Sequence, residues 1–173
     1  ENKVLEEIRD AVKEYYHVLQ GIQKTNEKVI QDMKECKAIA KENKALREEN
    51  EALKKEIKEL KEHAKNIRKN VLKEVANANS GHPGGSLSAA DIVTVLYFHV
   101  MDITAENAAS PDRDRFVLCK GHASPLLYAA FAEKGLIPEE ELMTFRKINS
   151  RLSGHPDGKK IPAIDMSTGS LGQ

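Results

Sequence analysis

The sequence predicts a mostly α-helical chain, in which a long coiled-coil helix precedes a truncated α/β domain. Of its 173 residues, the first 65 carry 30 charged side chains, whereas the other 108 carry only 24. Neither Gly nor Pro occurs from Ile22 to Ser80, but glycine-rich turns recur after Ser80. Such a change in composition indicates two regions, which we place at residues 1–57 and 58–173.

The first region has the heptad pattern of a coiled coil. Setting Leu46 and Leu53 at d positions puts Asn43 and Asn50 at a positions, and buried Asn pairs favour two parallel strands. The apolar seam recurs at spacings of three and four through Ile39, Leu46, Leu53, Ile57, Leu60, Ala64 and Ile67.

Charged residues beside the seam point to the same arrangement. Glutamates at g positions would face basic residues at e positions of a parallel partner; the members are Glu42, Glu49, Glu56, Arg47, Lys54 and Lys61. We therefore expect a homodimer through a parallel, in-register coiled coil over residues 39–67, with a break near His63. Before Ile39 the pattern weakens, because Thr25 and Asp32 occupy d positions. A solvated single helix is the alternative.

Composition narrows the possible partners and compartment. Acidic and basic side chains balance in both regions, so the sequence predicts no nucleic-acid or membrane partner. The apolar run 89–101 is too short for a membrane span and contains Asp91. Cys36 and Cys119 lack the spacing of a zinc site or a disulfide framework, which favours reduced thiols in a cytoplasmic protein. Because the chain starts at Glu1 rather than Met, the sequence leaves open whether a targeting segment has been trimmed off.

The stretch SGHPGGSLSAAD, residues 80–91, interrupts the helical pattern. Ser88 to Asp91 resembles a capping box and predicts a helix over Ile92–Val100. Glycines permit close approach of another group, and the new helix's first N–H groups suit an anion. His82 is then either a ligand in this turn or a residue that only fills it.

Two further histidines follow glycines. CKGHASP, residues 119–125, lies between a predicted strand, Phe116–Leu118, and a predicted helix that begins at Ser124; SGHPDG occupies 153–158. The loop STGSLGQ, 167–173, has the composition of a phosphate cradle. Single histidines so far apart, without carboxylate or thiol neighbours at ligand spacing, argue against zinc.

The four motifs together resemble a known family. SGHPGGSLSAADI, PDRDRFVLCKGHASPLLYAAFAEKG, SGHPDG and STGSLGQ are similar to the beginning of transketolases, especially split-gene N-terminal subunits, over residues 58–173. Residues 1–57 resemble no part of that family. The resemblance implies a thiamine diphosphate-binding α/β domain and transfer of a two-carbon ketol unit from a ketose phosphate to an aldose phosphate, as in the pentose phosphate pathway.

The resemblance also assigns roles to residues. His82 would shuttle protons beside cofactor and substrate, His155 would hydrogen-bond the donor's hydroxyls, and His122 would contact the diphosphate. Gly169 and Leu171 would offer main-chain contacts to the cofactor. The accompanying cation, Mg²⁺ or Ca²⁺, would have no ligand in this chain, because the family's metal-binding segment follows the position of Gln173.

The expected partners follow from that missing segment. The chain alone should be inactive and should need a C-terminal transketolase subunit or a missing remainder. The alternative is a coiled-coil assembly module that carries a catalytically inert transketolase remnant. The motifs fit 1-deoxyxylulose-5-phosphate synthase less well, and dihydroxyacetone synthase is not distinguished from transketolase.

Overall fold

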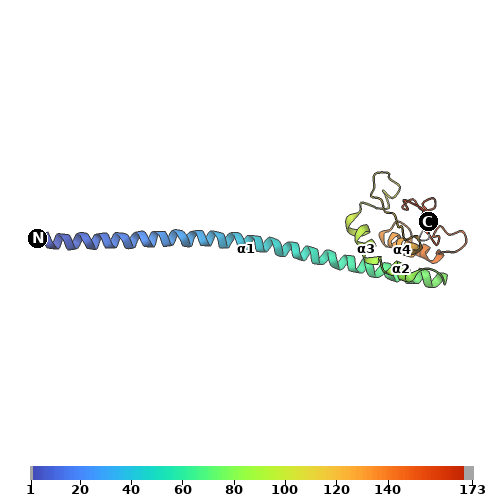
Figure 1. The fold of residues 1–173 in the computed structure, drawn as a ribbon, viewed down its shortest axis with the longest axis horizontal. Coiled ribbons are helices and arrows are strands. Elements are labelled where there is room, and N and C mark those ends of the chain that lie inside the picture. Colours follow the sequence, from blue (N-terminus) through green and yellow to red (C-terminus); the bar gives the residue numbers. More distant parts are fainter. Residues whose placement is uncertain (1, 170–173) are drawn as a thin grey trace. The chain divides into compact units, whose positions relative to one another are not determined.

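A computed structural model of the chain describes residues 2–169 and divides it into two compact units, Glu1–Lys54 and Lys55–Gln173 (Figure 1). Its α-helices are α1 (Asn2–Ala78), α2 (Pro83–Leu87), α3 (Ala90–Val95) and α4 (Ser124–Lys134). Shorter helical turns are a π-helical turn at Leu96–Val100 and 3₁₀ turns at Gly121–Ala123 and Glu139–Thr144.

The first unit is a single helix without a core. Every residue from 3 to 54 is exposed, including the seam residues Leu46 and Leu53, each 48% exposed. The absence of Gly and Pro between Gly21 and Gly81 explains the length of α1, because nothing in that stretch interrupts its backbone hydrogen bonds. None of the helices built from the described residues is both long and apolar enough to cross a membrane.

The second unit has a hydrophobic core around α4. All residues from Ser124 to Phe131 are buried, so this helix is covered on every side. The last turns of α1 and helix α3 contribute to the same core through Ile67, Val71, Ala90 and Val93. Tyr97 packs edge-on against Phe131, with ring centroids 5.8 Å apart.

The break of the coiled coil expected near His63 does not interrupt the helix itself, because α1 continues to Ala78. What changes near His63 is the exposure of the seam residues, most of which are exposed before this point, whereas those after it are buried. Ala64 and Ile67 are 5% and 0% exposed within the chain's own core. A partner helix has no access to them, so the coiled coil expected over residues 39–67 cannot extend through its last turns.

The helical part of the fold prediction is confirmed, but no strand forms in residues 2–169. Phe116–Leu118, predicted as a strand, therefore lacks that structure. A strand needs a neighbouring strand to pair its backbone N–H and C=O groups, and the described residues supply none. The α/β domain is accordingly not seen.

The segment 80–91 differs from expectation in detail. Helix α2 fills Pro83–Leu87, where an open turn was predicted, and α3 begins after Ala89 with no side-chain cap. Ser88 Oγ donates instead to the Gly85 carbonyl at 3.1 Å, so the capping box does not form. The predicted helix Ile92–Val100 is present, although its second half is a π-helical turn closed by Met101 N–H donating to the Leu96 carbonyl at 2.8 Å.

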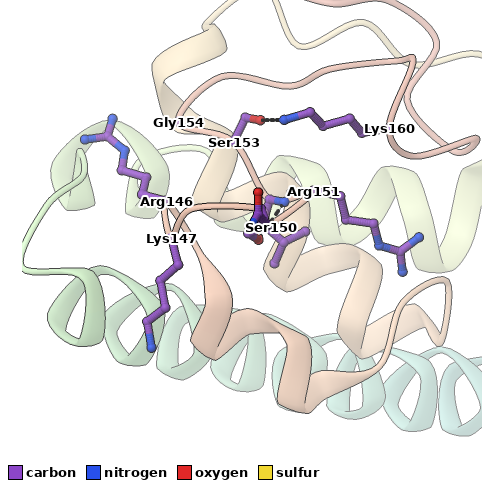
Figure 2. Close-up of a pocket in the computed structure, with 9 residues that line it drawn as sticks. Arg146, Lys147, Ser150, Arg151, Ser153, Gly154 and Lys160 are labelled. Carbon is purple, nitrogen blue, oxygen red and sulfur yellow. Dashed lines mark hydrogen bonds between the residues drawn. The ribbon is translucent and has the colours of Figure 1, made fainter.

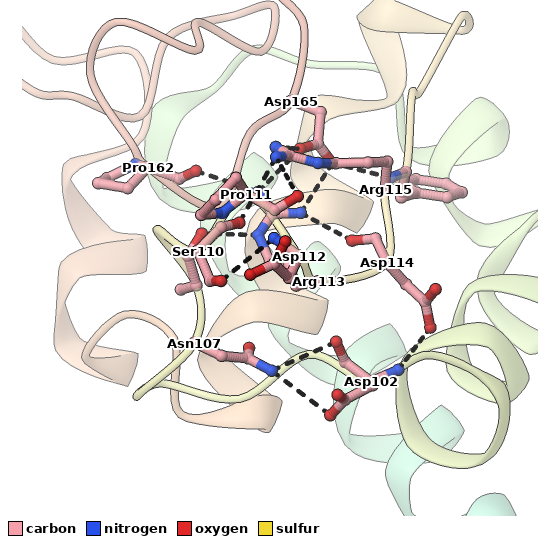
Figure 3. Close-up of polar contacts among 12 residues, drawn as sticks. Asp102, Asn107, Ser110, Pro111, Asp112, Arg113, Asp114, Arg115, Pro162 and Asp165 are labelled. Carbon is pink, nitrogen blue, oxygen red and sulfur yellow. Dashed lines mark hydrogen bonds and ion pairs between the residues drawn. The ribbon is translucent and has the colours of Figure 1, made fainter.

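A buried ion-pair network holds two loops of the second unit together (Figure 3). The side chains of Arg113 and Asp165 are 1% and 7% exposed, and their nearest atoms are 2.8 Å apart. Arg115 Nη1 and the Phe116 N–H also donate to Asp165, at 2.7 and 2.8 Å. Burial opposes ionisation of Asp165, but these donors lower its pKa below the ordinary value.

Candidate functional site

Two of the three predicted histidines lie against each other. His82 is the residue before α2, and His122 lies in the 3₁₀ turn that precedes α4. Their ring centroids are 4.9 Å apart at an interplanar angle of 63°. Residues forty positions apart in the sequence are thus brought together by the packing of α2 against α4.

The glycines of the first turn make this approach possible. A Cβ at Gly85 would lie 3.3 Å from His122 Nε2, a tight contact that a hydrogen avoids. Lys120 Nζ donates to the Gly85 carbonyl at 2.9 Å and to Ser88 Oγ at 3.2 Å. Lys120 and His122, the residues on either side of Gly121, therefore both contact the segment that contains SGHPGG.

Helix α4 holds the third Gly-His turn. Ser124 Oγ donates to the Gly154 carbonyl at 2.8 Å. The Tyr128 hydroxyl lies 2.9 Å from the Ser153 carbonyl and 3.3 Å from the His155 carbonyl. The SGHPDG turn is thereby held against the start of α4, just after His122.

The beginning of STGSLGQ lies directly on Gly121. A Cβ at Gly121 would be 2.4 Å from the Gly169 carbonyl oxygen, a distance at which the backbone would have to move. Thr168 N–H donates to the Pro156 carbonyl at 3.2 Å. The structure thus brings Gly169 to His122 and His155, whereas Leu171 lies outside the described residues.

The cluster has a positive electrostatic environment. Desolvation, followed by the charges of His82, Lys120 and His155, lowers the pKa of His122 from its ordinary value. His122 is consequently neutral at physiological pH. A neutral imidazole both donates and accepts a hydrogen bond, and nearby positive charge favours an anionic ligand.

Sequence analysis missed Lys120 and Tyr128. Lys120 stands immediately before a Gly-His pair, where a cation beside a candidate phosphate contact could have been noticed. Tyr128 gives no such signal, because an aromatic residue in an apolar helix predicts core packing. Only the fold reveals that its hydroxyl reaches the SGHPDG turn.

A cationic hollow of about 710 Å³ lies beside this turn (Figure 2). Its cationic side chains point in different directions, and three of them already have partners. Arg146 contacts Ser80, Arg151 pairs with Glu141 at 2.5 Å, and Lys160 Nζ donates to Ser153 Oγ at 2.9 Å. The cationic side chains of the hollow therefore do not converge on one point.

The described residues fit part of a thiamine diphosphate site. Thr168 Oγ1 is buried and has no hydrogen-bond partner among residues 2–169, so this hydroxyl is suited to a ligand beside Gly121. His122 and Lys120 add donors suited to phosphate oxygens. No group of three or more metal-ligating side chains converges in residues 2–169.

Comparison with known proteins identifies the family. The profile described as "Transketolase, thiamine diphosphate binding domain" matches residues 59–173. Mouse transketolase is 50% identical over 107 residues, which cover 62% of this chain and 17% of the mouse protein. The "6-deoxy-6-sulfo-D-fructose transketolase subunit SqwG" of Clostridium sp. (strain MSTE9) is 48% identical over 107 residues, covering 62% of this chain and 39% of that subunit.

Solved structures agree with this result. A transketolase mutant from Pichia stipitis has a TM-score of 0.62 at 36% identity, over 66% of this chain and 17% of that one. The Campylobacter jejuni transketolase has a TM-score of 0.58 at 38% identity, over 65% and 18% of the two chains. The chain therefore spans about a fifth to two fifths of the length of these relatives. Because the match extends over residues 59–173 and includes every Gly-His turn, the chain belongs to the transketolase family.

Proposed function

We propose that this chain is the N-terminal part of a transketolase that transfers a two-carbon ketol unit from a ketose phosphate to an aldose phosphate. The observation that carries the proposal is the convergence of the three Gly-His turns and Gly169 on one site, with His82 and His122 rings 4.9 Å apart. A chain that had lost this chemistry would have little reason to keep these residues together.

Each histidine has a role that its environment suits. His82 is exposed beside His122 and moves protons between substrate and solvent. His155, whose backbone is fixed by Tyr128, hydrogen-bonds the hydroxyl groups of the donor sugar. His122 remains neutral and donates a hydrogen bond to the diphosphate of the cofactor.

Thiamine diphosphate, when bound, supplies the electron sink that ketol transfer requires. The residues of this chain that would hold it are His122, the main chain of Gly169 and Leu171, and the buried Thr168 hydroxyl. A divalent cation, Mg²⁺ or Ca²⁺, would be held by residues outside 2–169. The remaining site would come from a C-terminal transketolase subunit or from further residues of the same protein.

Assembly is the second part of the proposal. Residues 39–57 pair with a second copy of the chain as a parallel coiled coil. The seam residues Leu46 and Leu53 are exposed, and Glu42 and Glu49 would face the partner's Arg47 and the partner's Lys54. The cytoplasm is the compartment in which unpaired Cys36 and Cys119 would stay reduced.

Calorimetry on the 173-residue chain tests the division of the site. Without a cation site, we expect weak thiamine diphosphate binding that does not depend on Mg²⁺. Tight, Mg²⁺-dependent binding by this chain alone would contradict that division.

Assay of the assembly purified from the cells that make the protein tests the activity itself. Ketol transfer should require thiamine diphosphate and a divalent cation. Intact mass above 19.3 kDa, or a co-purifying subunit, would identify the rest of the site. An intact assembly that transfers no ketol unit would favour the alternative, an assembly module with an inert transketolase remnant.

A further inference from the structure

The first unit exposes an apolar surface that extends well before Ile39. Large apolar side chains along this part of α1 are between 44% and 64% exposed. They are Val4, Leu5, Ile8, Val12, Tyr15, Tyr16, Val18, Leu19, Ile22, Val29, Ile30, Met33 and Ile39. An isolated helix gains nothing from so many exposed apolar groups, so this surface is suited to a partner.

Most of these residues before Ile39 fall on a seam whose register differs from that of residues 43–53, whereas Val4, Tyr16, Val18 and Ile30 lie beside it. One line has the spacing of seven through Ile8, Tyr15, Ile22, Val29 and Cys36, and it continues into Asn43 and Asn50. A second line lies three residues before the first and contains Leu5, Val12, Leu19, Asn26 and Met33, so Asn26 is its one polar member. In the later seam the second line, Ile39, Leu46 and Leu53, lies three residues after the first.

The change of register removes a difficulty of the simple heptad. With one register throughout, Thr25 and Asp32 would occupy core positions, and Asp32 would face the same carboxylate of a parallel partner. In the shifted register Asp32 moves to a flanking position, where it faces the partner's Lys37. A three-residue discontinuity of this kind between Cys36 and Asn43 overwinds a coiled coil locally without ending it.

The surface of α1 already has the sockets that such a seam needs. A shallow hollow of about 410 Å³ is lined by Val29, Asp32, Met33, Cys36, Lys37 and Ala40. In a coiled coil each core side chain enters a socket made by residues i, i+3, i+4 and i+7 of the facing helix. Residues 29, 32, 33 and 36 make one such socket, and residues 33, 36, 37 and 40 make the next.

We propose that residues 5–36 form a second coiled-coil segment with another copy of this chain, joined to the 39–57 segment through a register shift at residues 36–43. The proposal rests on the parallel dimer proposed above, because the Glu–Arg and Glu–Lys pairs beside Leu46 and Leu53 set the partner's direction and alignment. Parallel, in-register pairing places Cys36 opposite the partner's Cys36.

Crosslinking of Cys36 tests this arrangement directly. In a Cys119→Ser background, diamide oxidises two facing thiols to a disulfide and is itself reduced to the hydrazine. Facing core positions lie within the Cα separation that a disulfide allows. We expect a covalent dimer as the major product. The matched control is Cys36→Ser with Ala38→Cys, which puts the thiol on the outer face of α1 and should leave the chain uncrosslinked.

A second variant separates this inference from the dimer on which it rests. Cys36→Ser with Asn50→Cys reports only on the 39–57 coiled-coil segment. If Asn50→Cys crosslinks but Cys36 reacts no more than Ala38→Cys, the second segment is refuted while the dimer stands. If neither position crosslinks, both are refuted. Ketol transfer is measured independently, so its loss would not affect either result.

Discussion

Two helices of this chain differ in whether their apolar residues are exposed or buried. In the first unit, α1 exposes Leu46 and Leu53, whereas in the second unit α4 buries every residue from Ser124 to Phe131. Charged residues flank the seam of α1, so its apolar side chains become buried only when another helix packs against them. Helix α4 has few charges, and its own domain surrounds it. This contrast is the reason that we propose assembly through the first unit and a cofactor site in the second.

The two units should therefore respond differently to substitutions. Substitutions in the core or the ion-pair network of the second unit should change the free energy of unfolding of that unit and leave the helical signal of the first unit in place, because residues 3–54 are all exposed.

Asp165→Asn should cost the second unit about 3–5 kcal/mol, because it leaves the buried Arg113 guanidinium without its charge partner. Urea denaturation followed by tyrosine fluorescence measures the loss. The matched control is Asp112→Asn, at an exposed position of the same loop, which should change the free energy of unfolding by less than about 0.5 kcal/mol.

The Asp165 ion pair also predicts a pH dependence. Its folded pKa lies below the ordinary value of 3.8, so the folded state binds fewer protons. This stability is fully present above pH 3.8 and is lost as the pH falls through the folded pKa. Equal losses in wild type and Asp165→Asn on acidification would contradict the assignment.

Glu74→Met should stabilise the second unit. Both carboxylate oxygens of Glu74 are buried and have no hydrogen-bond partner in the part of the chain that the structure describes, and burial raises the pKa of Glu74 from 4.5 to about 10. The folded state keeps the proton that the unfolded chain releases above pH 4.5, so stability falls as the pH rises toward 10. At pH 7 the gain from Met should be roughly 3 kcal/mol.

The control for Glu74 is Glu59→Met, an exposed position of the same helix within the second unit. It should leave the pH dependence unchanged. Thermal unfolding at pH 5 and pH 9 distinguishes the two variants, since only Glu74→Met should flatten the decline. A decline of unchanged slope would show that Glu74 is ionised in the folded protein.

Gly121→Ala should cost about 1–3 kcal/mol, because its Cβ would meet the Gly169 carbonyl oxygen at 2.4 Å. Gly84→Ala is a matched control, since no atom lies within 4 Å of its added Cβ. That variant should be neutral or slightly stabilising. Chemical denaturation compares them, and equal behaviour would mean that the 167–169 loop does not lie on Gly121.

Much of this organisation follows from local sequence. The absence of Gly and Pro predicts α1, Ser124-Pro125 predicts the start of α4, and glycines beside His82, His122 and His155 mark the turns of the site. These features depend on neighbours along the chain. The capping box at Ser88 fails because its hydroxyl finds a closer acceptor in Gly85.

Long-range features could not be predicted in the same way. The Phe116–Leu118 segment has strand composition, but pairing depends on residues elsewhere. Ala64 and Ile67 continue the heptad seam, and only the packing of the second unit shows that its core covers them. Likewise, no local pattern joins Arg113 to Asp165 or brings Tyr128 to the SGHPDG turn.

Steady-state kinetics of the assembled enzyme measures whether the Gly-His turns bind cofactor and donor sugar, as we propose. His122→Ala should raise the thiamine diphosphate concentration needed for half-maximal activity, and His155→Ala should raise the KM of the ketose phosphate donor. His17→Ala, on the exposed helix of the first unit, is the control and should change neither. Wild-type constants in both site variants would contradict the account, because the histidines would then only fill turns.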